Sequence, residues 1–239
     1  MTAHHFFADD VEHDPIVLTG EEARHAARAL RVRPGEEVTV GDGRGTVARG
    51  IVGDAPTAQR VLIAVADRTL VQPSHPQVRV FPAVPKAGKL DEIVQHLTEV
   101  GVDRITPWFA ERSVARWDAR KCRSQGDRLR AIARAAAKQS RRAWLPIVDD
   151  PGKIDALPPG AVLLHEHATR RLSDTLRDLS SPSIVAVICG PEGGLTDTER
   201  VQFADAGALE ASLGPLVLRT ETAAIVGSAL VRNAFHLLG

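Results

Sequence analysis

Two segments near the carboxyl end combine glycine and proline with charged residues, and each lies between an apolar run and a helical pattern. They read GPEGGL at 190–195 and LGPLVLRTETA at 213–223. Open α/β proteins bind ligands at the carboxyl ends of strands, against the amino ends of helices. Main-chain groups freed at such turns can hold an adenine edge, and glycines let a flat ring approach closely. Neither segment has the spacing of a Walker loop or a GxGxxG motif.

Charged residues beside these turns favour a ligand that has a charged tail as well as a flat ring. Glu192, Arg219 and Glu221 supply the charge, and an adenosyl ligand fits. The alternative is that the glycines and prolines only shape turns, and that His165 is merely packed or solvated. The residues predicted to bind the ligand are Leu164, His165, Gly190, Pro191, Glu192, Gly193, Gly194, Leu213, Gly214, Leu218, Thr220 and Ala223.

The composition excludes several classes of protein. The 239 residues are 44% hydrophobic and 25% charged, and no apolar run approaches the roughly 20 residues of a membrane helix. The first residues lack the basic and apolar regions of a signal peptide, so a cytoplasmic protein is expected. Cys122 and Cys189 lie far apart without CxxC spacing and are expected to be reduced thiols. No HExxH occurs among the nine histidines, and no metal is expected.

Positive charge is concentrated in one part of a neutral chain. Residues 111–142 contain eleven Lys and Arg against three acids. This indicates an anionic partner, although a solvated arginine-rich helix is an equal alternative. Trp117 and Trp144 flank the region and could stack a base, with core packing as the alternative. The candidate phosphate contacts are Arg28, Arg31, Arg33, Arg130, Arg134, Lys138, Arg141 and Arg142.

The chain is expected to form two domains, residues 1–72 and 73–239, because the pattern changes at the proline-rich segment 71–76. Short β-rich runs separated by turn signals predict a small β-barrel or compact sheet in the first domain. Its predicted elements are a helix over 20–30 and strands over 38–40, 46–48, 51–52 and 61–65.

Alternating strands and helices predict an α/β fold for the second domain. The nearly continuous apolar run 183–189 is typical of a strand buried on both faces. Thr196 and Glu199 have the spacing of a capping box. The other predicted elements are strands over 78–83, 102–108, 161–166 and 209–213, and helices around 90–97, over 128–142 and over 222–238. The last helix is apolar around much of its circumference, which favours an additional dimer interface.

The two carboxyl-terminal segments resemble the signature segments of the RsmE-type 16S ribosomal RNA uridine-N3 methyltransferases, a family of the SPOUT superfamily. The similarity extends along nearly the whole chain. Further segments that resemble family positions, in order, are Phe6-Phe7, His25 with Leu30-Arg31, Pro85-Lys86, EVGV at 99–102, Arg112-Ser113 and Gln139-Ser140-Arg141.

This resemblance implies a PUA-like RNA-binding domain followed by a SPOUT-type methyltransferase domain with a carboxyl-terminal trefoil knot. It also implies a homodimer with the cofactor site near the dimer interface. The implied cofactor is S-adenosylmethionine, and the implied substrate is one uridine near the 3′ end of 16S rRNA in the assembled small subunit. The alternatives are a non-catalytic RNA-binding or assembly factor and a SPOUT methyltransferase acting on another RNA.

Methylation at uridine N3 requires loss of the N3 proton or stabilisation of the resulting anion. A carboxylate can act as the base and a guanidinium can stabilise the carbonyl oxyanion. The predicted catalytic pair is Arg219 and Glu221, with a salt bridge at the helix start as the alternative. The chain departs from the family at His96, where lysine is common, and at Leu216-Val217, where an Arg-Ile pair is frequent.

Overall fold

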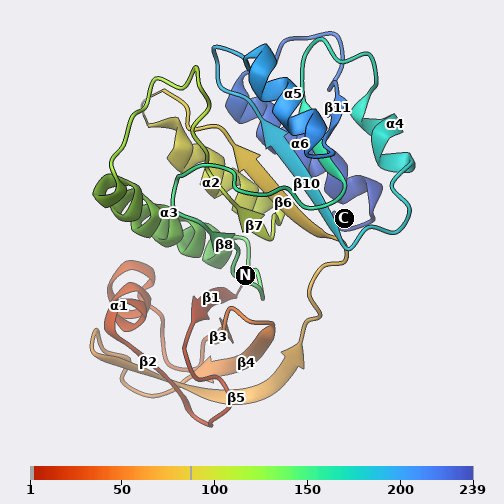
Figure 1. Cartoon of the computed structure of the whole chain (residues 1–239). Helices are drawn as coiled ribbons and strands as arrows, with labels where there is room; N and C mark the ends of the chain where they lie inside the picture. Colours follow the sequence, from red (N-terminus) through yellow and green to blue (C-terminus); the bar gives the residue numbers. More distant parts are fainter. Residues whose placement is uncertain (1–2, 87, 239) are drawn as a thin grey trace. The chain divides into compact units, whose positions relative to one another are not determined.

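The computed structural model describes residues 3–86 and 88–238, and it divides into two compact units (Figure 1). Unit 1 contains the chain up to Pro73 together with Ala137–Leu145, and unit 2 contains Ser74–Ala136 and the chain from Pro146 onward. The sequence predicted two contiguous domains. In the structure, unit 1 also includes Ala137–Leu145, which lies far from the rest of that unit in the sequence. The main chain of this segment joins the rest of unit 1 through the bond from Gly45 N–H to the Ala143 carbonyl, 3.1 Å.

Unit 1 is built on a five-stranded sheet with the order β1-β3-β4-β5-β2. β1 runs parallel to β3, and the other neighbours are antiparallel. The β3–β4 hairpin closes because the Asp42 carboxylate accepts the N–H groups of Arg44 (2.6 Å) and Thr46 (3.0 Å). The elements are β1 His4–Phe7, β2 Ile16–Thr19, α1 Gly20–Arg24, a π-helical turn η1 His25–Leu30, β3 Glu37–Gly41, β4 Thr46–Val52 and β5 Arg60–Leu70.

Two predictions for unit 1 were wrong in detail. The strands expected at 46–48 and 51–52 are one strand, β4, whose register shifts between Arg49 and Gly50. A Cβ on Gly50 would lie 2.5 Å from the Ala64 carbonyl oxygen, so the shift depends on glycine. The helix expected over 20–30 changes to π-helical hydrogen bonding at His25.

Unit 2 is a six-stranded parallel sheet with the order β11-β9-β10-β6-β7-β8. Its strands are β6 Gln77–Pro82, β7 Arg104–Ile105, β8 Ile147–Val148, β9 Ala161–Leu164, β10 Ile184–Cys189 and β11 Leu209–Ala211. Its helices are α2 Lys89–Val100, α3 Ala119–Gln139, α4 Leu172–Arg177, α5 Asp197–Asp205 and α6 Thr220–Ala234, with the last turn of α3 lying in unit 1.

Side chains of β10 alternate between two hydrophobic cores, as the period of a strand requires. Val185, Val187 and Cys189 join the core that includes residues of α2, α4 and α6. Ala186 and Ile188 join the other core, which includes Trp108 and Phe203. Both faces of the strand are therefore covered, and this explains the continuous apolar run.

The ends of several elements differ from their predicted bounds. The helix predicted over 128–142 begins earlier and ends at Gln139, because Arg141 adopts a left-handed conformation (φ 54°). The Arg142 N–H then bonds to the Ala137 carbonyl, 2.9 Å, and closes the last turn. The strand predicted over 102–108 is only Arg104–Ile105, and the last helix is shifted to Thr220–Ala234.

Among the described residues, no helix is both long enough and apolar enough to cross a membrane. The same residues contain no group of three or more His, Cys, Asp or Glu side chains placed to hold a metal ion.

Candidate active site

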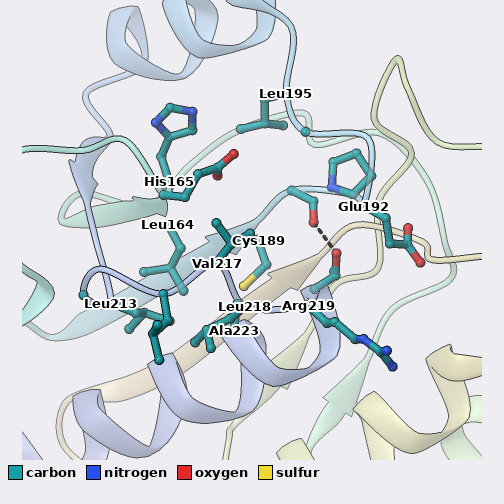
Figure 2. Close-up of a pocket in the computed structure, with 17 residues that line it drawn as sticks. Leu164, His165, Cys189, Glu192, Leu195, Leu213, Val217, Leu218, Arg219 and Ala223 are labelled. Atoms are coloured by element: carbon teal, nitrogen blue, oxygen red, sulfur yellow. Dashed lines mark hydrogen bonds between the residues drawn. The ribbon is translucent and has the colours of Figure 1, made fainter.

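A cavity of about 280 Å³ lies where β9 and β10 end and α6 begins (Figure 2). β10 stands between β9 and β6 in the sheet. The chain leaves β10 toward β11, beyond β9, and leaves β6 toward β7, on the other side. Ligands of open α/β sheets bind at such a reversal of strand order. The cavity is lined by Leu164, His165, Glu166, Cys189, Gly190, Pro191, Glu192, Gly194, Leu195, Leu213, Gly214, Leu216, Val217, Leu218, Arg219, Thr220 and Ala223.

All residues predicted to bind the ligand line this cavity except Gly193. The sequence reasoning missed Glu166, Cys189, Leu195, Leu216 and Val217 as lining residues. Glu166 directly follows His165, and Leu216 and Val217 lie inside the second predicted segment, so their positions in the sequence could have indicated them.

The first loop, residues 190–195, is held by one internal turn bond and by hydrogen bonds from residues outside it. The Gly194 N–H bonds to the Pro191 carbonyl, 2.9 Å, with Gly194 at a positive φ of 70°. Nη1 of Arg112 donates to the carbonyls of Gly193 (3.1 Å) and Leu195 (3.3 Å). The Lys86 N–H donates to Glu192, 3.2 Å. Gly193 therefore packs against Arg112, outside the cavity.

Glu199 fixes the far end of the same loop. The predicted capping box is confirmed, because Thr196 Oγ1 accepts the Glu199 N–H and the Glu199 carboxylate accepts the Thr196 N–H, 2.8 Å. The other carboxylate oxygen accepts the Glu111 N–H, 2.8 Å, and Glu199 is buried. One side chain thus caps α5 and ties this loop to the segment that carries Arg112.

The second loop, residues 213–219, has few internal restraints. Gly214 (φ 125°) exchanges two hydrogen bonds with the Ser212 hydroxyl. Leu216 and Val217 are 74% and 79% exposed. The Leu218 N–H donates to no acceptor within residues 3–86 and 88–238. This loop offers free main-chain donors and apolar side chains to a ligand.

Thr220 connects the two loops at the start of α6. Its hydroxyl donates to the Gly190 carbonyl, 3.0 Å, as the dashed line in Figure 2 shows. Further along α6, a Cβ on Gly227 would lie 2.7 Å from Cδ1 of Leu164. The absence of that Cβ lets α6 pack closely against the end of β9.

The predicted catalytic pair is separated. Arg219 is exposed and lines the cavity, where Figure 2 shows its side chain directed away from the leucines. Glu221 does not line the cavity; it is largely buried and forms an ion pair with Lys89 of α2. Burial raises the pKa of Glu221, but the hydrogen bond from Lys89 and the Lys89 charge outweigh it and hold the pKa below its ordinary value. A carboxylate so stabilised in its charged form is a weak base.

Two side chains in the cavity wall differ in what they offer a ligand. Nδ1 of His165 is buried and has no hydrogen-bond partner among the described residues, so it can form a hydrogen bond with a ligand. Burial raises the pKa of Cys189 to about 12, which keeps the thiol protonated and unreactive near neutral pH.

The predicted phosphate contacts fall into two groups. Arg28, Arg31 and Arg33 of unit 1 are exposed and form no ion pair with any described residue. Arg130 instead pairs with Asp127 (2.8 Å) and Asp150 (3.0 Å), and Lys138 pairs with Glu22 (3.1 Å). The remaining predicted contacts are exposed at Arg141 and partly buried at Arg134 and Arg142. Part of the positive charge concentrated in residues 111–142 is therefore neutralised by ion pairs within the fold.

Comparisons with known proteins agree with this architecture. The RNA methyltransferase domain model matches residues 72–232, and the RNA methyltransferase PUA domain model matches residues 18–65. The ribosomal RNA small subunit methyltransferase E of Mycobacterium bovis is 39% identical over 225 residues, which are 90% of this chain and 85% of that protein. The enzyme of the same name from Bacillus subtilis is 28% identical, covering 92% of this chain and 91% of its own.

A methyltransferase from Legionella pneumophila, solved with its bound cofactor SAM, has the same fold. It superposes with a TM-score of 0.85 at 26% identity and covers 98% of both chains. With the match of the domain model to more than half of the chain, these similarities show that the chain belongs to the ribosomal RNA small subunit methyltransferase E family.

Proposed function

We propose that this protein transfers the methyl group of S-adenosylmethionine to N3 of one uridine near the 3′ end of 16S rRNA, in the assembled small subunit. The observation that carries the proposal is the cavity at the carboxyl ends of β9 and β10, whose walls are the two segments that resemble the signature segments of this family. Family membership and the cofactor bound in the Legionella structure support the choice of ligand.

The cavity wall fits the chemistry of S-adenosylmethionine. Leu164, Leu213 and Leu218 offer apolar contact to an adenine ring, and the Leu218 N–H and His165 Nδ1 are polar groups without a partner in the described chain. Glu166 provides negative charge for the sulfonium and the ammonium group of the cofactor. When bound, the cofactor supplies an electrophilic methyl group.

The catalytic roles follow from which charged groups reach the cavity. Arg219 stabilises the carbonyl oxyanion of the uracil as N3 loses its proton. Glu192 is exposed and lines the cavity, so it is better placed than Glu221 to accept that proton. Glu221 positions the start of α6 through Lys89. Alignment of N3 with the methyl carbon supplies much of the remaining rate enhancement.

We further propose that unit 1 binds RNA through Arg28, Arg31 and Arg33, and that unit 2 contains the trefoil knot and dimerises. Exposed apolar side chains support a homodimer: Val226 (38%) and Leu230 (44%) on α6, with Leu216 and Val217 in the adjacent loop. Sedimentation equilibrium of Leu230→Glu against the wild-type protein tests the dimer, because a charge in a buried interface should give monomers.

The decisive experiment is methyl transfer to purified small subunits, large subunits and tRNA from cells lacking this activity. We expect label only on small subunits, and mass spectrometry of the nucleosides should identify 3-methyluridine. A different nucleoside, or label on tRNA, would favour the alternative RNA substrate. Absence of calorimetric heat with millimolar S-adenosylmethionine would favour a non-catalytic assembly factor.

Arg219→Ala tests the proposed cation. The first-order rate constant should fall by about 100-fold or more, the effect of removing one oxyanion donor. Because Arg219 is exposed, the free energy of unfolding and the oligomeric state should be unchanged. Arg177→Ala, an exposed arginine on α4, is the matched control. Retained turnover in Arg219→Ala would remove this residue from the mechanism.

A further inference from the structure

Unit 2 has a second cleft, with a volume of about 740 Å³, between the segment after β7 and helix α5. Aromatic side chains dominate its wall. Trp108 and Phe203 pack edge to face with ring centres 5.4 Å apart, and Phe109 and Trp117 pack similarly at 5.5 Å. Trp108 is buried and its indole N–H bonds to the Phe81 carbonyl, 3.1 Å, so it belongs to the fixed floor. Trp117 is partly exposed and can receive a ligand.

Five charged side chains line this cleft: the acids Glu111, Asp118 and Glu199, and the cations Arg116 and Lys153. Glu199 is occupied by the N–H groups of Glu111 and Thr196, and Asp118 accepts the Lys121 N–H at the start of α3 (2.7 Å). The Arg116 guanidinium donates one hydrogen bond, from Nη2 to the Glu111 carbonyl, 3.0 Å. Arg116 and Lys153 line the cleft and are exposed, and neither forms an ion pair within the described chain.

A third cation, Lys121, lies over the Trp117 ring. Nζ of Lys121 lies 5.2 Å from the centre of the Trp117 ring. An aromatic platform beside exposed cations is how proteins bind single-stranded nucleic acid, since the ring stacks on a base and the cations hold the phosphates.

The cleft and the proposed active site are connected by one segment, residues 193–199. Leu195 lines the cavity at the ends of β9 and β10, while Glu199, four residues later, lines the cleft. Arg112 and Glu111 hold this shared segment through the Gly193 carbonyl and the Glu199 carboxylate. A strand that places one nucleotide in the cavity therefore has an aromatic site next to the same loop.

We propose that this cleft binds an unpaired nucleobase next to the target nucleotide, with the base stacked on Trp117 and its phosphate held by Arg116 and Lys153. The inference rests on the proposed function only in that the ligand is RNA. A basic peptide is disfavoured because two of the cleft acids are already engaged by main-chain N–H groups, and an apolar peptide would leave the cations without partners.

The test uses a single-stranded uridine-rich hexanucleotide and the full chain. Binding should quench tryptophan fluorescence, and Trp117→Phe should lose most of the signal while keeping most of the affinity, because phenylalanine still stacks. Trp117→Ala should weaken binding by about 5- to 100-fold, the range for loss of one stacked base. Arg116→Gln with Lys153→Gln should weaken binding and lower its dependence on salt concentration. Arg177→Gln on α4 is the exposed control and should leave both unchanged.

Folding and activity are read separately from RNA binding. Because Trp117 is partly buried, the exposed pair Arg116→Gln and Lys153→Gln keeps the test valid if Trp117→Ala unfolds. The affinity for S-adenosylmethionine should be unchanged in all variants, while KM for small subunits rises more than kcat falls. Hexanucleotide binding that is insensitive to all three positions would overturn the proposal. If no methyl transfer occurs but Trp117-dependent binding persists, the proposed function fails and this inference stands.

Discussion

The two loops that wall the cavity differ in how unit 2 holds them. Residues 190–195 are restrained by Arg112, by Lys86 and, through the capping box, by Glu199. Residues 213–219 are restrained mainly by Ser212, and Leu216 and Val217 are exposed. One wall is therefore set by the fold, and the other is free to adjust to what it covers.

This difference separates the tasks of the two loops. A restrained wall can fix the position of a ligand without an ordering cost at the moment of binding, which is the advantage of preorganisation. An adjustable wall can admit the ligand and close over it. Thr220 joins the two walls through the Gly190 carbonyl, so ordering of the second loop is linked to the first.

Glu199→Ala should release the restraint on residues 190–195 and cause the largest loss of stability among these variants. It leaves the N–H groups of Glu111 and Thr196 without an acceptor and removes the capping box. Hydrogen bonds to charged groups contribute about 1.5–3 kcal/mol and a cap about 1 kcal/mol, so the free energy of unfolding should fall by about 3 kcal/mol. Urea denaturation measures this change.

Asp197→Ala is the matched control for Glu199→Ala. Asp197 is a fully exposed acid in the first turn of the same helix, with a weak 3.7 Å contact to Arg200. Its loss should cost less than about 1 kcal/mol, the usual contribution of a carboxylate near a helix amino end. Equal losses in the two variants would show that the restraint on the first loop does not come from the Glu199 carboxylate.

The sequence indicated both loops because their signals are local. Gly190, Pro191 and Gly194 stand next to an apolar run that only a doubly buried strand explains, and Thr196 with Glu199 gives a capping box by spacing alone. Side-chain restraints from distant segments carry no such signal. Arg112 reaches Gly193 across 81 positions, and no periodicity relates them.

The same reason explains where the structure departs from the expected arrangement. Adjacent position suggested that Arg219 and Glu221 act together, but the partner of Glu221 is Lys89, 132 positions away. The end of α3 was placed too late because Arg141 stops the helix in a left-handed conformation without glycine. The strand β1 was not predicted, since its pairing partner β3 lies more than thirty residues away.

Gly227→Ala should change the shape of the cavity by displacing a side chain in its wall. The added Cβ would lie 2.7 Å from Leu164 Cδ1, so the Leu164 side chain must move, and it lines the cavity. The affinity for S-adenosylmethionine should fall about tenfold by calorimetry, which is about 1.4 kcal/mol. Because alanine favours a helix interior by about 1 kcal/mol over glycine, stability should change little.

A second substitution decides whether the Gly227→Ala effect passes through Leu164. Adding Leu164→Val removes the crowded methyl and should restore part of the lost affinity, with a favourable coupling between the two changes. Additive losses would show that α6 itself has moved, and not the Leu164 side chain.

The Glu221–Lys89 ion pair predicts a smaller, pH-dependent effect on the start of α6. The folded state holds the pKa of Glu221 below the ordinary value of 4.5, because hydrogen bonding and charge from Lys89 outweigh burial. Its contribution to stability is therefore complete above pH 4.5 and is lost as the pH falls through the lowered folded pKa. Glu221→Gln should reduce the fall in urea midpoint below pH 4.5. If the urea midpoint of Glu221→Gln falls below pH 4.5 as steeply as that of the wild-type protein, the ion pair contributes nothing to stability.

Leu216→Ser with Val217→Ser tests the adjustable wall and should have the smallest effect on stability. Both side chains are mostly exposed, so the free energy of unfolding should change by less than about 0.5 kcal/mol at concentrations where the chain is monomeric. Both also line the cavity, so the dissociation rate of S-adenosylmethionine should rise because less apolar surface covers it. A loss of stability comparable to that of Glu199→Ala would mean that the second loop is as much a part of the fold as the first.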